Sequence, residues 1–369
     1  MNVVGVEGVS DALEQLWGAQ LLDELFASDG RDEKRRLHTL SFLFLRAMEG
    51  RGTIKTWQPL KRAAYQALSN WPDLSLDERN RLNLVHMVAV RHMGCKEPFV
   101  VPDLAWINEQ EDNLRYHLYA QLLQQGADCG TPTASELDIL VGGIPSPAPN
   151  LPLNAYKLFG AYARSLANRG EFEAAVQYQL SAASGFLAAT RHADATYALS
   201  ETFRLGGALG LKDIVEKADE TWALVGMARD IREGGWFVEL ARARAKVSLG
   251  EAPQVRENLK SLVANLDAPT HLRASAIRWL HRCPGDPDQN GMAVLQKLME
   301  LPGGEGRIAK LFLMLIELDA ALDESDEQAA AVALDGLRDG MSGVVEQLEK
   351  AAEERGLAPP AYVARWFPY

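Results

Sequence analysis

Apolar residues recur along most of this chain at intervals of three and four positions, the spacing that places side chains on one face of an α-helix. The capping-box pair Ser75 and Glu78 marks the start of one such run. Only 98–101 and 136–144 offer short strand candidates, so an all-α chain is predicted. The expected helices cover these ranges: 9–27, 32–49, 56–69, 76–93, 110–126, 153–168, 172–188, 192–206, 212–227, 235–249, 253–266, 270–281, 290–301, 306–322, 326–338 and 341–355.

A run rich in proline and glycine, GGIPSPAPNLP at 142–152, interrupts the helical pattern. Proline lacks the backbone N–H that a helix interior or a central strand requires, so neither continues through this run. The run is therefore interpreted as a linker between an N-terminal helical region, 1–141, and a second helical region that begins at 153. A length of 369 residues also favours several domains or an elongated array over one core.

Glycines recur forty residues apart in the second region, each between two helical runs: Gly170, Gly210 and Gly250. Glycine accepts the left-handed backbone that ends a helix, so each is predicted to lie at the turn of a helical hairpin. Small and aromatic residues surround the first of these turns: Phe159, Tyr162, Ala163, Phe172, Ala175 and Ala182. The alanines would let two antiparallel helices approach closely.

This pattern resembles a tetratricopeptide repeat (TPR), a helix pair with small residues at three positions and a glycine and an aromatic at its turn. Gln179 stands where that family has an aromatic, and Leu187 where it has a proline. The forty-residue spacing also exceeds the family's usual length of about 34. The resemblance covers 153–270. It implies a right-handed helical-hairpin solenoid with a concave groove that binds peptides, continued over 271–369 by further helical repeats and an aromatic tail.

Basic and aromatic residues repeat with the same period as the glycines. Arginines stand six residues before each turn: Arg164, Arg204 and Arg244. A second position, seven residues earlier and on a similar helix face, is basic or aromatic: Lys157, Tyr197 and Phe237. One hypothesis is a basic, partly aromatic ladder that binds an acidic or C-terminal peptide, because guanidinium groups pair bidentately with carboxylates. The alternative is that these arginines lie in water or pair with neighbouring acids.

Net charge and cysteine content indicate which partners the protein binds and in which cellular compartment it is found. The net charge of −12 repels phosphate backbones, so nucleic-acid binding is not expected. The three cysteines are too few and too widely spaced for a disulfide framework, which indicates a reducing compartment: Cys95, Cys129 and Cys283. The N-terminus lacks a basic secretory signal, and the longest apolar runs are far shorter than the roughly 20 residues that span a bilayer. A cytoplasmic protein without membrane contact is expected.

No motif predicts catalysis or cofactor binding. His86 and His92 are six positions apart and so face different sides of a helix, which argues against a zinc site with Cys95. The G-x-G-x-x-A run at 304–309 follows a helix instead of the strand that a dinucleotide site requires. We therefore expect no metal and no cofactor.

The interpretation that follows is a non-catalytic scaffold or adaptor that holds a partner protein or peptide in a concave helical groove. One alternative is a TPR-like regulatory sensor that a peptide or small effector switches. A second alternative is an all-helical enzyme with an unrecognised site, for which His117, Glu136 and Asp138 near the linker are candidates. The end WFPY, 366–369, is expected to cap an apolar face, with a docking peptide or a homodimer contact as alternatives.

Overall fold

The computed structural model describes these parts of the chain: 33–49, 54–129, 135–144, 151–225, 232–283 and 289–367. All the regular secondary structure in these parts is helical, which confirms the predicted all-α class. The chain divides into two compact units, the first ending at Gly170 and the second beginning at Glu171. The helix expected over 9–27 and the centre of the expected linker, 145–150, lie outside the described residues, and the domain boundaries stay predictions.

The first unit contains these described helices: α3 (Glu33–Glu49), α4 (Ile54–Asn70), α5 (Leu76–His92), α6 (Leu104–Asn108), α7 (Asp112–Cys129), α8 (Ser135–Gly142) and α9 (Leu153–Asn168). α5 packs against α3, α4 and α7, and α7 packs against α9. The predicted capping box is present at the start of α5. The Ser75 hydroxyl accepts a hydrogen bond from the Glu78 N–H, and the Glu78 carboxylate accepts one from the Ser75 N–H.

Neither strand candidate forms a strand. Residues 98–101 have no regular structure, and 136–144 lie mostly within α8. Leu137 and Val141 are four positions apart and are both buried. Ile139, midway between them, is 76% exposed. A strand would place all three side chains on one face, whereas a helix turns Ile139 to the opposite side, so the burial pattern is that of a helix.

The second unit contains these described helices: α10 (Phe172–Ala188), α11 (His192–Leu209), α12 (Lys212–Val225), α13 (Arg232–Ser248), the 3₁₀ turn η1 (Ala252–Gln254), α14 (Arg256–Ala264), α15 (Thr270–His281), α16 (Gln289–Met299), α17 (Gly304–Asp323), α18 (Glu327–Glu353) and α19 (Pro359–Trp366). The helices expected over 326–338 and 341–355 correspond to the two helical stretches of the element α18. It is kinked at Met341, where the backbone is not helical. The sequence pattern did not predict α19.

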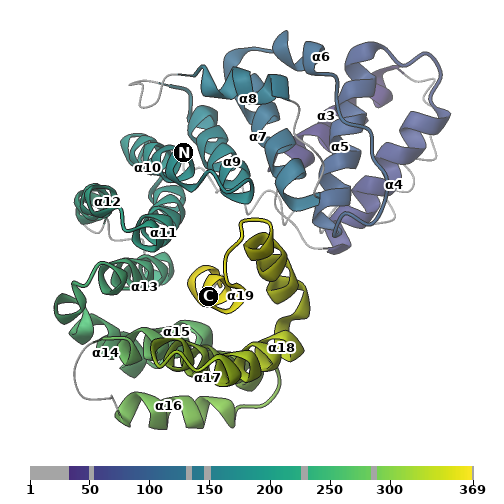
Figure 1. Cartoon of the computed structure of the whole chain (residues 1–369). Helices are drawn as coiled ribbons and strands as arrows, with labels where there is room; N and C mark the ends of the chain where they lie inside the picture. Colours follow the sequence, from purple (N-terminus) through teal and green to yellow (C-terminus); the bar gives the residue numbers. More distant parts are fainter. Residues whose placement is uncertain are drawn as a thin grey trace. The chain divides into compact units, whose positions relative to one another are not determined.

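Alternate helices of the second unit pack side by side. α11 contacts α13, α13 contacts α15, and α15 contacts α17, while α10 contacts α12 (Figure 1). Two such rows are what stacked helical hairpins produce. The finer prediction, a right-handed TPR-like solenoid, stays a prediction.

The glycines that repeat every forty residues follow the ends of helices, as predicted. Gly170, Gly210 and Gly250 have φ values of 80°, 74° and 79°. These values lie in the left-handed region that glycine adopts without strain. At the end of α11, the Leu211 N–H closes the turn by donating to the carbonyl of Gly206 at 2.9 Å.

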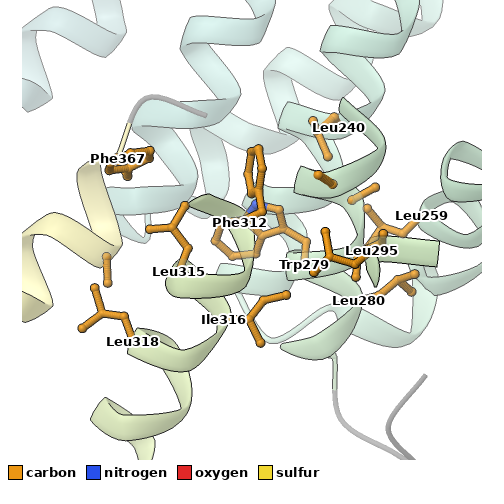
Figure 2. Packing of buried hydrophobic residues seen from close by; sticks show 14 of the residues in the cluster. Leu240, Leu259, Trp279, Leu280, Leu295, Phe312, Leu315, Ile316, Leu318 and Phe367 are labelled. Atoms are coloured by element: carbon orange, nitrogen blue, oxygen red, sulfur yellow. The ribbon is translucent and has the colours of Figure 1, made fainter. Parts of the chain in front are cut away.

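The C-terminal helix α19 lies within the second unit, near α13, α15 and α18 (Figure 1). It contacts α17 and α18, and its Trp366 stacks on Phe172 with ring centroids 4.4 Å apart. Phe367 is buried in the core that also contains Leu240 and Trp279 (Figure 2). Trp366 and Phe367 therefore cover apolar surface, as the capping hypothesis predicts, while the last two residues lie outside the described part.

Candidate functional site

A cavity of about 420 Å³ lies along α11, α13 and α15, and we call it the inner-helix cavity. This volume is in the range of sites that bind small ligands or single segments of a peptide. Its apolar wall is made by these residues: Ala193, Tyr197, Phe237, Leu240, Ala241 and Leu272. Its polar groups are these: Thr196, Ser200, Glu201, Arg204, Arg244, His271 and Ser275.

The forty-residue period of the sequence explains why α11 and α13 present matching side chains to this cavity. Tyr197 and Arg204 are seven positions apart on α11, and Phe237 and Arg244 are seven apart on α13. Seven positions are nearly two turns, so each pair lies on one helix face. Because α11 packs against α13, the four side chains line one cavity. Their role in binding a partner stays a prediction.

Tyr197 and Phe237 are the exposed large side chains of the wall. Their exposed fractions are 66% and 46%, whereas most large apolar side chains of this unit are buried. Phe237 also contacts the ring of His271, with centroids 5.7 Å apart. Exposed aromatic side chains beside a cavity are the kind of surface that gains free energy when a ligand covers it.

Arg204 is already paired with an acid. Its Nε and Nη2 donate to one carboxylate oxygen of Glu201 at 3.0 and 2.7 Å. The two residues are three positions apart on α11, so the pair forms within one helix. Arg204 therefore pairs with a neighbouring acid, which was the alternative to the ladder.

Arg244 lies in a different environment. Its exposed fraction is 7%, its Nη2 donates to the Arg365 carbonyl at 2.7 Å, and its guanidinium carbon lies 5.2 Å from the centre of the Trp279 ring. No carboxylate oxygen among the described residues lies within 4.0 Å of this guanidinium. Burial, together with the charges of Arg278 and Arg204, lowers the pKa of Arg244 to about 9, so the group is charged at pH 7.

Two hydroxyl groups of the cavity lining lack hydrogen-bond partners in the described structure, those of Ser200 and Ser275. Thr196 differs, because its hydroxyl donates to the carbonyl of His192 at 2.7 Å. Burial lowers the pKa of His271, so this ring is neutral at pH 7. The cavity thus combines aromatic walls, two spare hydroxyl donors and one buried cation.

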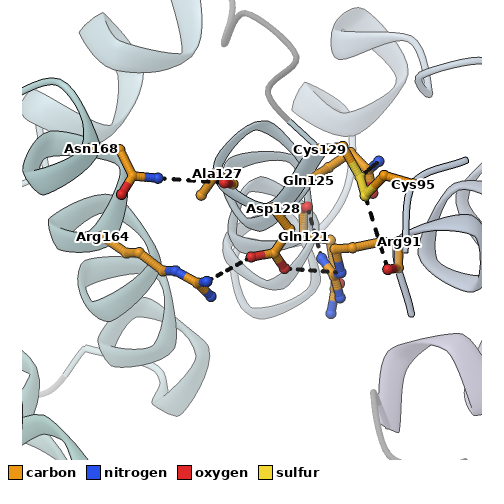
Figure 3. The surroundings of a disulfide bond; sticks show 9 residues. All are labelled: Arg91, Cys95, Gln121, Gln125, Ala127, Asp128, Cys129, Arg164 and Asn168. Atoms are coloured by element: carbon orange, nitrogen blue, oxygen red, sulfur yellow. Dashed lines mark hydrogen bonds and ion pairs between the residues drawn. A yellow bond between two sulfur atoms is a disulfide. The ribbon is translucent and has the colours of Figure 1, made fainter. Parts of the chain in front are cut away.

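Arg164 and Lys157, the other two predicted partner-binding residues, lie on α9 in the first unit. Arg164 Nη2 lies 2.8 Å from one carboxylate oxygen of Asp128, whose other oxygen is 3.8 Å from Arg91 Nε (Figure 3). Lys157 is partly buried. The charge of Arg164 is therefore shared with an acid, as the alternative to the ladder expected.

Cys95 and Cys129 form a disulfide beside this ion pair, with Cα atoms 5.3 Å apart (Figure 3). The expectation of no disulfide was wrong for these two residues. They are 34 positions apart in sequence, and they meet because α5 and α7 pack together. Cys283 is a free, buried thiol whose pKa burial raises.

A buried arginine next to α19 was missed by the sequence analysis. Arg278 is fully buried, and its Nε and Nη2 donate to the two oxygens of Asp319 at 2.7 and 3.0 Å. Nη2 also donates to the Ala364 carbonyl at 2.7 Å. Together with Arg244, it binds the C-terminal carbonyls of α19, where the helix dipole is negative. The sequence pattern could not predict these contacts, because α19 has only eight residues and shows no clear helical period.

The metal-site and catalytic candidates considered from the sequence are not brought together into a site among the described residues. The described residues contain no group of three His, Cys, Asp or Glu side chains that could hold a metal ion. His92 stacks on Trp57, and His117 is buried against Gln121, with its pKa lowered to about 4 by burial. Asp138 pairs with Arg169, and the side chain of Glu136 lies outside the described part.

Within the described parts, no helix has both the length and the apolar character needed to cross a membrane.

Comparison with known proteins leaves the function open. No family model, no curated protein and no solved structure matches the chain. Any functional argument therefore depends on the geometry of its own residues.

Proposed function

We propose that this protein is a non-catalytic adaptor that holds a segment of a partner protein or a peptide against α11, α13 and α15. The observation that carries the proposal is the inner-helix cavity, with its exposed aromatic wall and the buried cation of Arg244. Aromatic and arginine side chains supply much of the binding energy at protein interfaces. The resemblance to tetratricopeptide repeats supports the same face, because that family binds peptides along its first helices.

The hypothesis that the same cavity is a catalytic site has less support. A serine nucleophile needs a base within hydrogen-bonding distance. The hydroxyls of Ser200 and Ser275 have no hydrogen-bond partner in the described structure, so His271 activates neither of them. The net charge of −12 likewise argues for a protein or peptide partner over a nucleic acid.

The predicted location in the cytoplasm is also part of this proposal, although the Cys95–Cys129 disulfide is typical of an oxidising compartment. In a reducing compartment Cys95 and Cys129 would be thiols, and in an oxidising one they would keep the disulfide. Rapid alkylation of intact cells, followed by mass spectrometry, distinguishes the two states. Alkylation of both residues supports the cytoplasm, and protection of both contradicts it.

The adaptor proposal is tested with three variants of the full chain. Tyr197→Glu and Phe237→Glu change exposed positions of the cavity wall, and Leu224→Glu changes an equally exposed position on α12, outside the cavity. Partners are captured with the wild type, identified, purified, and titrated against each variant. The proposal predicts at least a tenfold loss of affinity for the first two variants and wild-type affinity for the third. Equal affinity for all four proteins would contradict it.

One observation favours a second candidate, the regulatory sensor. Arg244 lines the cavity and also donates to the Arg365 carbonyl of α19, so one guanidinium connects the binding site to the C-terminal helix. A ligand that moves this group would change how firmly α19 is held. Hydrogen exchange of α19 amides with and without bound partner tests this, and unchanged exchange contradicts the sensor.

A further inference from the structure

The charges that line the inner-helix cavity leave one positive charge without a counter-ion. The acidic and basic side chains of the lining are Glu201, Arg204, Arg244 and His271. Glu201 and Arg204 neutralise each other within α11, and His271 is neutral at pH 7. Arg244 is left as a buried cation with no carboxylate beside it among the described residues. A buried unpaired charge is costly, so an anion that reaches it gains more than it would at the surface.

Arg244 is also held in place before any ligand arrives. Its bond to the Arg365 carbonyl and its position over the Trp279 ring fix the plane of the guanidinium. Holding the group in advance reduces the ordering cost of binding. A planar guanidinium matches the two oxygens of a carboxylate. The hydroxyls of Ser200 and Ser275, which have no hydrogen-bond partner in the described structure, belong to the same lining.

The remaining lining limits the size and charge of that anion. A second negative charge would find no free cation, because the only other arginine of the lining, Arg204, is paired with Glu201. The volume of about 420 Å³ and the wall of Tyr197, Phe237 and Leu240 suit an apolar or aromatic body next to the charge. Dianionic phosphate esters and polyacidic segments therefore match this lining less well than a single carboxylate.

We propose that the inner-helix cavity binds one carboxylate carried on an aromatic or large aliphatic body, with Arg244 as its counter-ion. The inference rests on the proposed function for the location of the site, and it adds the chemical class of the ligand. Such a group is found at the C-terminus of a peptide that ends in an apolar residue and in small apolar carboxylic acids. Both sources present the same chemistry to Arg244.

Calorimetric titration of the full chain with matched probes tests this class. The probes are N-acetyl-leucyl-phenylalanine, its C-terminal amide, 4-phenylbutyrate, 4-phenylbutanamide and phenyl phosphate. We expect at least one free acid to bind at least tenfold more tightly than its amide and more tightly than phenyl phosphate. Binding of only the dipeptide acid assigns the site to peptide C-termini, and binding of 4-phenylbutyrate assigns it to small acids as well.

Variants separate a binding role from a structural one. Arg244→Met is expected to lower the affinity for the free acid at least tenfold, whereas Arg242→Met, on the same helix but outside the cavity lining, leaves it unchanged. Because Arg244 also holds α19, Tyr197→Glu provides a second test at an exposed position. Its added charge should weaken binding of the free acid more than binding of the amide, which a general loss of structure would not do.

Several results would overturn the inference. They are equal affinity of acid and amide, tighter binding of phenyl phosphate, an unchanged affinity in Tyr197→Glu, and no binding of either free acid up to about 5 mM. The adaptor proposal fails separately. If captured partners depend on Phe237 but acid and amide bind alike, only the ligand class is wrong. If the acids bind but no partner depends on Phe237, only the adaptor is wrong.

Discussion

The helices α11 and α13 approach each other closely at Gly207, and the substitution Gly207→Ala tests whether this contact sets their spacing. A Cβ atom at this position would lie 2.4 Å from the Cα and 2.7 Å from the Cβ of Ala245. The first of these atoms belongs to the backbone, so no change of rotamer can relieve the overlap. One helix must shift, and the two helices that line the cavity are the ones that separate.

The magnitude follows from two opposing terms. Inserting a methyl group into a packed core costs typically about 1–3 kcal/mol, and an overlap with backbone belongs at the upper end of that range. Replacing a helical glycine by alanine gains about 1 kcal/mol of helix propensity. The net loss for Gly207→Ala is therefore about 2 kcal/mol, which for a unit of this size lowers the melting temperature by about 4–8 °C.

Thermal and urea unfolding, followed by far-UV circular dichroism, measure this loss. Gly343→Ala is the matched control, since Gly343 lies in α18 and no atom comes within 4 Å of its added Cβ. The control should match or exceed the wild type in stability, because only the propensity term acts. If Gly207→Ala is as stable as Gly343→Ala, the close packing of α11 on α13 is wrong.

Three further predictions concern buried pairs, the disulfide and pH. Asp319→Ala leaves the guanidinium of Arg278 buried without its acid, so the free energy of unfolding from urea titration should fall by about 3–5 kcal/mol. Reducing the Cys95–Cys129 disulfide opens a loop of 34 residues, and the first unit should lose up to about 4 kcal/mol in urea unfolding with reductant. Burial lowers the pKa of His117 to about 4 from its ordinary 6.5. The unfolded chain then binds a proton that the folded chain does not, so stability falls by about 3 kcal/mol as the pH drops through this window.

Each of these has its own control. Asp335→Ala removes an exposed acid from a surface pair with Arg338 and should cost less than about 1 kcal/mol; a similar loss in both aspartate variants would contradict the buried network. Reductant should leave a Cys95→Ala, Cys129→Ala double variant unchanged. His117→Gln should remove the extra acid sensitivity, and an unchanged pH profile in that variant would refute the role of His117.

Much of the helical pattern could be predicted from the sequence because it depends on local spacing. The 172–188 and 270–281 ranges match α10 and α15 as predicted. The short helices α6, α8 and α19 were not predicted. They have five to eight residues, which is too few for a helical period of apolar residues to be recognised. Tertiary packing stabilises such helices, and that packing cannot be read from one segment alone.

Four of the six predicted site residues line the cavity, whereas Lys157 and Arg164 lie on α9 in the first unit, and the charges of the site were predictable only in part. The repeat spacing identified Tyr197, Phe237, Arg204 and Arg244, which the structure brings to one cavity. The pairing of Arg204 was also readable, because Glu201 stands three positions before it. What spacing could not show is that Arg244 is buried beside α19, since its contact with Arg365 spans 121 positions.

The disulfide shows a second limit of sequence analysis. Three widely spaced cysteines predicted no disulfide framework. Yet Cys95 lies just after α5, Cys129 is the last residue of α7, and these two helices contact each other. Such a pairing depends on which helices are neighbours, and one sequence does not contain that information. The same holds for Asp128, whose pairing with Arg164 joins α7 to α9.

The most direct test of the central claim is photo-crosslinking from the wall of the inner-helix cavity in living cells. A photoreactive phenylalanine replaces Tyr197 in one strain and the equally exposed Leu224, outside the cavity, in another. The adaptor account predicts that a discrete partner crosslinks from position 197, that Phe237→Glu abolishes the product, and that position 224 yields none of it. The same product from both positions, or no product from position 197, would contradict the account.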